Sequence, residues 1–140
     1  MNELQVINNK KIESMIYEVR GKQVMLDSDL AKIYHCKNGT KEINQAVKRN
    51  INRFPPEFCF QLTEDEYLFL KSQFVTSKHK GRGGVRKLPY VFTEHGIIML
   101  SSVIKSDIAA KTNVAIINAF VKMKSYISSN LIEQKSAQSH

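Results

Sequence analysis

The chain has 140 residues, 42% of them hydrophobic and 24% charged, which is typical of one folded domain and unlike a disordered or collagen-like chain. Its 21 lysines and arginines exceed its 13 aspartates and glutamates, and the formal net charge of +8 favours a polyanionic partner or, less often, an acidic membrane surface. Two cysteines exclude a disulfide scaffold, and the sequence shows neither a signal peptide nor an apolar membrane span. We therefore expect a soluble, basic, cytoplasmic domain that is not inserted in a membrane.

The N-terminal part is predicted to consist of a leader and a β-hairpin. Residues 1–14 show little hydrophobic pattern and are expected to be the leader. Two alternating runs, residues 17–20 and 23–26, flank a two-residue turn at Gly21-Lys22. Alternation predicts strands with one buried face, and glycine suits the tight turn between them.

Two helices are predicted after the hairpin. Asp27 or Ser28 is expected to cap a short helix that ends near Tyr34. A break at residues 37–39 follows, and a threonine is expected to cap a second helix over residues 40–53. The pair has the outline of a helix-turn-helix, although its turn of about five residues is longer than the usual three or four.

The outward face of residues 40–53 is the first candidate binding site. A helical wheel places basic and amide side chains opposite the apolar ones, and only Glu42 adds a negative charge. Lysine and arginine can donate to guanine or phosphate, and glutamine and asparagine can pair with adenine in the major groove. An ordinary solvated face is the alternative. The predicted groove contacts are Lys41, Gln45, Lys48, Arg49 and Asn52, and the predicted core side is Ile43, Ala46, Val47, Ile51 and Phe54.

The second half of the chain alternates short strands with helices. Residues 58–62 and 89–92 are predicted strands. Thr63 and Glu66 form a capping box that begins one helix, and Thr93 is expected to cap another. The order predicts a helix-rich α+β single domain with a helix-turn-helix-like pair, a small antiparallel β component and a long C-terminal helix.

Residues 75–87 are predicted to form a basic, glycine-rich loop. Between Lys71 and Lys87 the sequence has six basic residues and no acidic one. Such a loop suits an arm that follows phosphates or reaches into a minor groove, with a solvated loop as the alternative. A nucleotide-binding loop is disfavoured because its glycine-lysine pattern is missing. The predicted phosphate contacts are Lys78, Lys80, Arg82, Arg86 and Lys87.

No catalytic or metal site is predicted. The histidines and cysteines form no pair with the spacing of zinc ligands, and the acidic run at 64–66 is accounted for by the capping box. We expect no enzyme activity, no cofactor and no small-molecule substrate. The residues considered as metal ligands are His35, Cys36, Cys59, His79 and His95.

The C-terminal helix, residues 107–128, has apolar residues on two faces. One stripe can serve the core, and the other needs a second chain, more of this chain, or the hairpin. We expect a homodimer that sets two DNA-contacting helices at a fixed spacing, with a wholly buried central helix as the alternative. Residues 129–140 are expected to be a polar tail that could begin a linker to a missing C-terminal region. The second stripe is Ala110, Val114, Ile117 and Val121.

Six motifs follow one another in fixed order: IYEVRGKQVMLDSDLAKIY at 16–34, NQAVKRN at 44–50, RFP at 53–55, FCFQLT at 58–63, RKLPYVFTEHG at 86–96 and MLSSV at 99–103. Together they resemble the phage ORF-six N-terminal domain, which is related to the KilA-N and Bro-N DNA-binding domains of phage antirepressors and large DNA viruses. The resemblance implies a DNA-binding module, often the N-terminal part of a longer regulator, and it implies no catalytic residues. The KilA-N-like domain is expected over residues 15–128.

We therefore expect a non-catalytic DNA-binding domain of a bacterial or prophage regulator, of the antirepressor or transcription-regulator type, bound to double-stranded DNA. Residues 40–53 would lie in the major groove and residues 75–87 on the backbone. Two other classes stay open. One is a protein-interaction module that sequesters a repressor through the C-terminal helix. The other is an RNA-binding domain that stacks bases on an open sheet face, with the candidates Phe58, Phe60, Tyr90 and Phe92.

Overall fold

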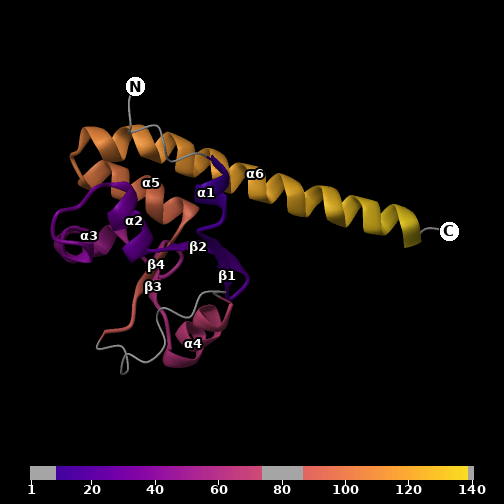
Figure 1. Cartoon of the computed structure of the whole chain (residues 1–140), viewed down its shortest axis with the longest axis horizontal. Helices are drawn as coiled ribbons and strands as arrows, with labels where there is room; N and C mark the ends of the chain where they lie inside the picture. The colour runs from indigo at the N-terminus through magenta and orange to yellow at the C-terminus, as the bar shows by residue number, and fades with distance from the viewer. Residues whose placement is uncertain (1–8, 74–86, 139–140) are drawn as a thin grey trace.

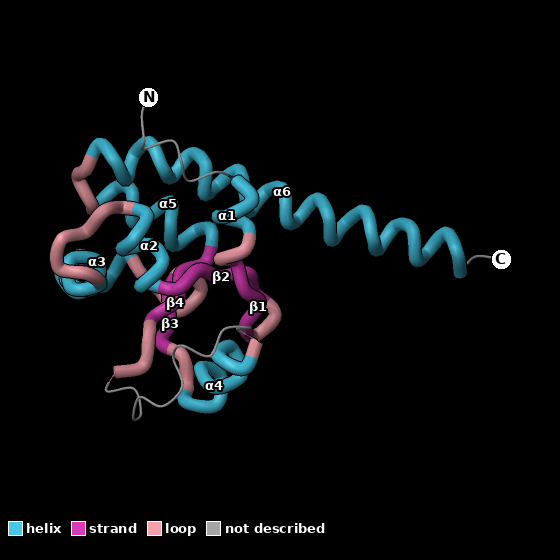
Figure 2. The backbone as a smooth tube through the Cα atoms, viewed as in Figure 1, coloured by secondary structure: helices cyan, strands magenta, loops and turns pink. Residues whose placement is uncertain are grey.

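The computed structural model describes residues 9–73 and 87–138, and the surroundings of side chains within 11–73 and 87–127. A four-stranded antiparallel sheet lies between a group of helices on one side and a single helix, α4, on the other (Figures 1 and 2). This arrangement confirms the α+β prediction. The elements in chain order are α1 (Asn9–Glu13), β1 (Ile16–Val19), β2 (Lys22–Leu26), α2 (Asp27–Ile33), α3 (Thr40–Arg49), the 3-10 turn η2 (Ile51–Arg53), β3 (Cys59–Gln61), α4 (Glu64–Ser72), β4 (Tyr90–Thr93), α5 (Glu94–Val103) and α6 (Asp107–Gln138).

The sheet has the strand order β1-β2-β4-β3, and it separates two apolar cores. Phe92 of β4 pairs with Met25 and Cys59 on its two neighbours, and these three side chains enter the larger core with α2, α3, α5 and α6. Val91, one position earlier, pairs with Phe60 and belongs to the smaller core under α4. Because side chains alternate between the two faces of a strand, adjacent residues of β4 pack against different helices on opposite faces of the sheet.

The predicted hairpin and the predicted caps of α4 and α5 are confirmed, with the hairpin turn displaced by one residue. Arg20 and Gly21 occupy the hairpin turn with φ of 56° and 74°, one residue earlier than predicted, and two positive φ values are the requirement of the tight hairpin turn. The Thr63 hydroxyl accepts from the Glu66 amide at 3.1 Å, and the Glu66 carboxylate accepts from the Thr63 amide at 2.8 Å. Thr93 caps α5 in the same way, accepting from the backbone N–H of Gly96 at 3.3 Å.

Two predictions for the ends of the domain are wrong. The expected leader includes α1, whose Ile12 is 1% exposed and belongs to the larger core. The long helix begins at Asp107, as predicted, with the Ser106 hydroxyl accepting from the Ala109 amide. It does not fade near residue 128, because α6 runs on to Gln138 and projects beyond the body of the domain (Figure 1).

Candidate nucleic-acid interface

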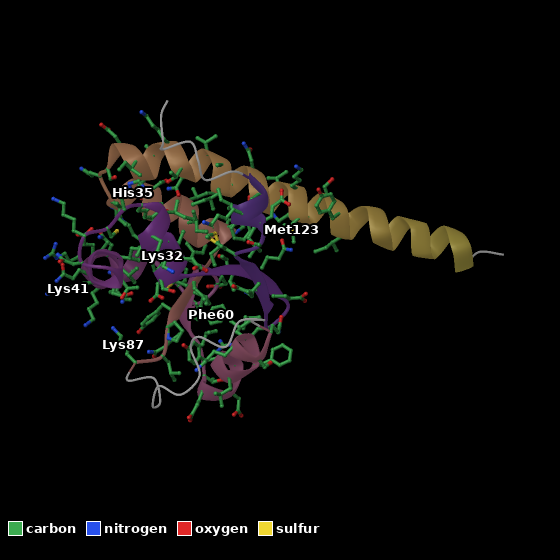
Figure 3. All side chains as sticks on the ribbon, viewed as in Figure 1. Lys32, His35, Lys41, Phe60, Lys87 and Met123 are labelled. Atoms are coloured by element: carbon green, nitrogen blue, oxygen red, sulfur yellow. The ribbon has the colours of Figure 1, made fainter. Side chains whose placement is uncertain are left out.

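The outward face of α3 is basic and exposed. Ile43 and Val47 are buried, with exposures of 0% and 8%, and they fix the inward face of the helix. The one acidic residue of α3 is Glu42, and burial together with this nearby carboxylate raises the pKa of the Cys36 thiol in the preceding turn. The remaining outward face is therefore cationic or amide-bearing, and Lys41 extends from it into solvent (Figure 3). The predicted groove residues are all exposed: Lys41, Gln45, Lys48, Arg49 and Asn52.

The helix is shorter than predicted. It ends at Arg49, because Asn50 leaves the helical conformation and its side-chain amide donates to the carbonyl of Ala46 at 2.8 Å. Asn52 therefore lies on η2 rather than on α3. The helical wheel does not apply beyond Arg49, because a 3-10 turn follows the α-helix. Ile51, which was predicted to be on the core side, is therefore 59% exposed.

The position of α3 depends on the turn before it and on α2. His35 and Gly39 in this turn have φ of 60° and 62°. Gly39, not Thr40, is the N-cap residue of α3, and its backbone conformation favours glycine. Likewise α2 begins at Asp27 without a side-chain cap, so neither Asp27 nor Ser28 caps it as predicted.

A buried hydrogen bond ties this two-helix unit to α6. The Tyr34 hydroxyl, at the end of α2, donates to the Asn113 side-chain oxygen at 2.6 Å. Tyr34 is 4% exposed and Asn113 is 7% exposed. Separating the two buried side chains would leave polar groups without a partner and would cost free energy. The bond therefore fixes where α2 contacts α6.

The second half of the predicted contact set lies mostly outside the described residues. This holds for Lys78, Lys80, Arg82 and Arg86, so these four remain predictions. Lys87 is described and exposed, with its ammonium 5.9 Å from the centre of the Tyr90 ring. It is the predicted phosphate contact that the structure brings close to α3.

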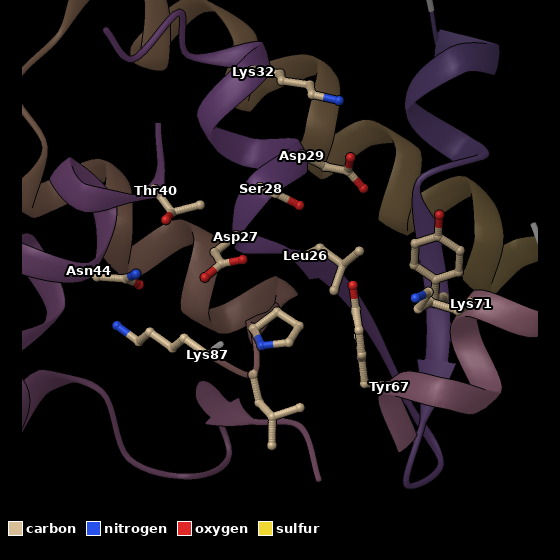
Figure 4. Close-up of a pocket in the computed structure, with 13 residues that line it drawn as sticks. Leu26, Asp27, Ser28, Asp29, Lys32, Thr40, Asn44, Tyr67, Lys71 and Lys87 are labelled. Carbon is tan, nitrogen blue, oxygen red and sulfur yellow. The ribbon is translucent and has the colours of Figure 1, made fainter. Parts of the chain in front are cut away.

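Lys87 and α3 border the same hollow, a cavity of about 330 Å³ between the start of α2, α3, α4 and residues 87–89 (Figure 4). Lysines from three segments line it: Lys32, Lys71 and Lys87. Two carboxylates also line it, and burial raises the pKa of both Asp27 and Asp29. The hollow is thus a mixed-charge junction between the two predicted contact regions.

Asn44 is the residue that the sequence analysis missed. It lies on α3 at the margin between the buried and exposed faces, and the structure shows it half-buried beside the hollow. Its side-chain amide interacts with the carboxylate of Asp27, which is only 4% exposed, and lowers the pKa of that carboxyl. The signal in the sequence was its marginal position on the wheel, which suits a polar residue that bonds within the protein.

The other chemical candidates do not gather into a site. Within residues 9–73 and 87–138, no group of three or more histidine, cysteine or acidic side chains could hold a metal ion. Burial raises the pKa of the Cys36 thiol to about 11 and that of Cys59 to about 12, so both are protonated at neutral pH. No helix in these ranges is long and apolar enough to cross a bilayer.

The aromatic residues considered for base stacking do not form a platform. Phe92 is fully buried in the larger core, whereas Phe60 is 8% exposed and belongs to the smaller core on the opposite face of the sheet. The Phe58 ring is stacked on His95 with 5.6 Å between ring centres. None of these three faces is open for a nucleotide base.

The second apolar stripe of α6 is largely uncovered. Val114 is 63% exposed and Val121 is 52% exposed, and Ala110 is also exposed. Ile117 differs, because it is half-buried against the larger core. The opposite stripe of the same helix is buried through Ile116 and Phe120, which are 0% and 1% exposed.

These features define a small basic α+β module that presents one cationic helix to solvent. The ORF6N domain family matches residues 14–103, more than half of the chain, and the chain belongs to this phage-associated family. The match runs from the hairpin through α5 and leaves α6 outside. No curated protein and no solved structure matches the chain.

Proposed function

We propose that this chain is a non-catalytic DNA-binding domain of a bacterial or prophage regulator. In this proposal α3 enters the major groove of double-stranded DNA, and the basic segment 75–87 follows the phosphate backbone. The observation that carries it is the outward face of α3 and of the turn η2 that follows it, where three cations and two amides are exposed. Family membership supports the phage-regulator setting.

The chemistry of this face suits duplex DNA. An α-helix with its side chains is about as wide as the major groove, so one exposed face can reach the base edges. Gln45 and Asn52 supply paired donors and acceptors for adenine, and Arg49 supplies the fork that pairs with guanine. Lys41 and Lys48 add attraction for phosphates, and about six neutralised phosphates would give a slope near −5 for log affinity against log salt.

The division of labour between the two regions is testable. Fluorescence anisotropy with a selected duplex and a scrambled duplex would compare Gln45→Ala with Arg82→Ala. Gln45→Ala is expected to cost about 1–3 kcal/mol on the selected duplex and to relax base preference, whereas Arg82→Ala weakens both duplexes alike and lowers the salt slope by about one. Identical behaviour of the two variants on every duplex would contradict this assignment.

We further propose that a second copy of the chain covers the exposed stripe of α6. The stripe residues 110, 114, 117 and 121 repeat at alternating steps of four and three, the spacing of apolar positions in paired helices. Exposed valines at two of these positions favour a protein partner over solvent. A two-fold pair would set two α3 helices at a fixed distance and favour a symmetric DNA site.

The same stripe supports a second candidate function, a protein-interaction module that sequesters a repressor. The exposure of Val114 and Val121 is the observation in its favour. A monomeric chain that binds no duplex at low salt, yet captures a defined partner in a Val114-dependent manner from nuclease-treated lysate, would favour this candidate over the first.

A further inference from the structure

The feature that the proposed function leaves unexplained is a buried carboxylate. Asp27 begins α2 and is 4% exposed. Burial raises its pKa, although its hydrogen bonds and the nearby Lys87 ammonium act in the opposite direction. An ionised side chain in this position costs stability unless its partners compensate for the loss of water. The carboxylate therefore calls for a role in addition to packing.

The partners of Asp27 come from separate segments of the chain. One carboxylate oxygen accepts from the backbone N–H of Tyr90 at 3.2 Å, where β4 begins. Asn44 of α3, next to Gln45 in the sequence, lines the same hollow as Asp27, and its side-chain amide interacts with the carboxylate and lowers its pKa. Lys87, three residues before Tyr90, faces the carboxylate from the end of the basic segment, and Figure 4 shows Asn44 and Lys87 on the same side of Asp27.

A carboxylate is suited to this junction because both of its oxygens accept hydrogen bonds. It can hold the Tyr90 amide and the Asn44 amide at once while attracting Lys87, whereas an asparagine offers one acceptor and one donor group. The neighbouring Asp29 lines the same hollow with a half-buried side chain. No hydrogen bond from α3 or β4 to Asp29 is found among the described residues, which makes it a matched reference for the loss of one negative charge.

We propose that Asp27 is a positioning residue of the DNA interface, which fixes α3 through Asn44 and the end of the basic segment through Tyr90 and Lys87. This inference rests on the proposed function. In it, Asn44 does not pair with a base; its side chain belongs to the support of α3. The spacing between groove contacts and backbone contacts is then set by one buried side chain, and selectivity between duplexes depends on it.

The test compares Asp27→Asn with Asp29→Asn, since each removes one negative charge from the same hollow. Anisotropy titrations would use a duplex selected from a random pool and a scrambled duplex of equal composition. Asp29→Asn should strengthen both complexes alike, because it removes a repulsive charge. Asp27→Asn should lower the affinity ratio between the two duplexes about fivefold or more, similar to the effect of one mismatched base pair.

A swap of the two partners separates a positioning role from a general loss of structure. Asp27→Asn combined with Asn44→Asp restores one carboxylate and one amide at the junction, so the affinity ratio should return toward that of the wild type. If Asp27→Asn does not fold, Asn44→Ala tests the same bond from the side of α3 and should lower the ratio as well. The Tyr90 amide proton resonance gives an independent readout, since it should move in Asp27→Asn and stay in place in Asp29→Asn.

The inference is overturned if the wild type discriminates between the duplexes and folded Asp27→Asn discriminates equally well. It is also overturned if Asp29→Asn loses selectivity to the same degree, because charge alone would then explain the effect. A wild-type chain that binds neither duplex at low salt would instead contradict the proposed function, and this inference with it.

Discussion

The two helices α3 and α6 both bury one apolar stripe, but they expose different chemistry on the other side. The free face of α3 carries lysine, arginine and amide side chains, whereas that of α6 carries Val114 and Val121 with more than half of each side chain exposed. A cationic face is stable in water and suits a hydrated polyanion. An apolar face is unfavourable in water and suits a protein surface.

The difference indicates that the domain has two separate surfaces for two kinds of partner. The family match includes α3 and leaves α6 outside. The cationic surface is therefore part of the matched domain, whereas the apolar surface is not. One link between them, besides the shared larger core, is the buried Tyr34–Asn113 bond. Variants that affect one surface should therefore leave the other intact unless they weaken this link.

The largest expected effect comes from the inward face of α3. Ile43→Ala removes a fully buried side chain and should lower the free energy of unfolding by about 2–5 kcal/mol. Gln45→Ala, two positions away on the exposed face, should change it by no more than about 0.5 kcal/mol. Urea unfolding followed by circular dichroism measures both. Equal losses of stability in the two variants would contradict the assignment of the faces.

The link between the two surfaces is expected to be the next most sensitive feature. Tyr34→Phe leaves the buried Asn113 side chain without its hydroxyl partner, and should cost about 1–3 kcal/mol of unfolding free energy. Tyr34→Phe combined with Asn113→Leu removes both polar partners and should recover part of that loss. If the double variant loses more unfolding free energy than the two single variants lose together, the result would argue against a paired buried bond.

The exposed stripe of α6 should affect assembly rather than folding. Val114→Ser combined with Val121→Ser should convert a dimer to a monomer in light scattering, with a change of about 0.5 kcal/mol or less per site in the stability of the protomer. Lys111→Ala, also exposed on α6, is the control and should stay dimeric. A wild-type chain that is monomeric at high concentration would rule out the dimer.

Acid should also weaken a contact at a third place, away from both helices. Arg20 of the hairpin turn pairs with Glu66 of α4 at 2.7 Å, and this contact holds the pKa of Glu66 down at about 2. Because this pKa is lowered on folding, the stabilising effect is present above the unfolded value of 4.5 and is lost as pH falls toward 2. Glu66→Gln keeps the capping pattern and removes the charge.

The melting temperature of Glu66→Gln should therefore lie below that of the wild type at pH 7, and the difference should shrink between pH 4.5 and pH 2. The pair is solvent-exposed, so the effect should be the smallest of the four. A difference that is constant across this pH range would show that the ion pair does not contribute through its charge.

The elements that the sequence predicted correctly are those with a local chemical cause. The glycine at the hairpin turn, the Thr63–Glu66 capping box and the Thr93 cap each satisfy backbone groups within a few residues, so their patterns are visible in the sequence. The exposed face of α3 was predicted for the same reason. The 3.6-residue period of a helix decides which side chains share a face, and this does not depend on distant segments.

The errors arose where contacts between distant segments decide the structure. Among the side chains of α1 that the structure describes, Ile12 is fully buried in the larger core, and α1 packs against α6. The contact between Asp27 and Asn44 joins two helices, and only Asn44 was on the wheel, at a margin between its faces. The helix α3 ends before the predicted residue 53, because the Asn50 side chain bonds to the helix backbone.

The central claim is that α3 binds DNA through its outward face. The most direct test is an anisotropy titration of a duplex pool at several salt concentrations, with Lys48→Ala/Arg49→Ala beside the control Lys105→Ala/Lys111→Ala, which removes two exposed cations from the α6 side. We expect steep salt dependence for the wild type, and a loss of about 2–4 kcal/mol in binding free energy for the α3 variant alone. Absence of binding at low salt, or equal losses in the two double variants, would contradict the claim.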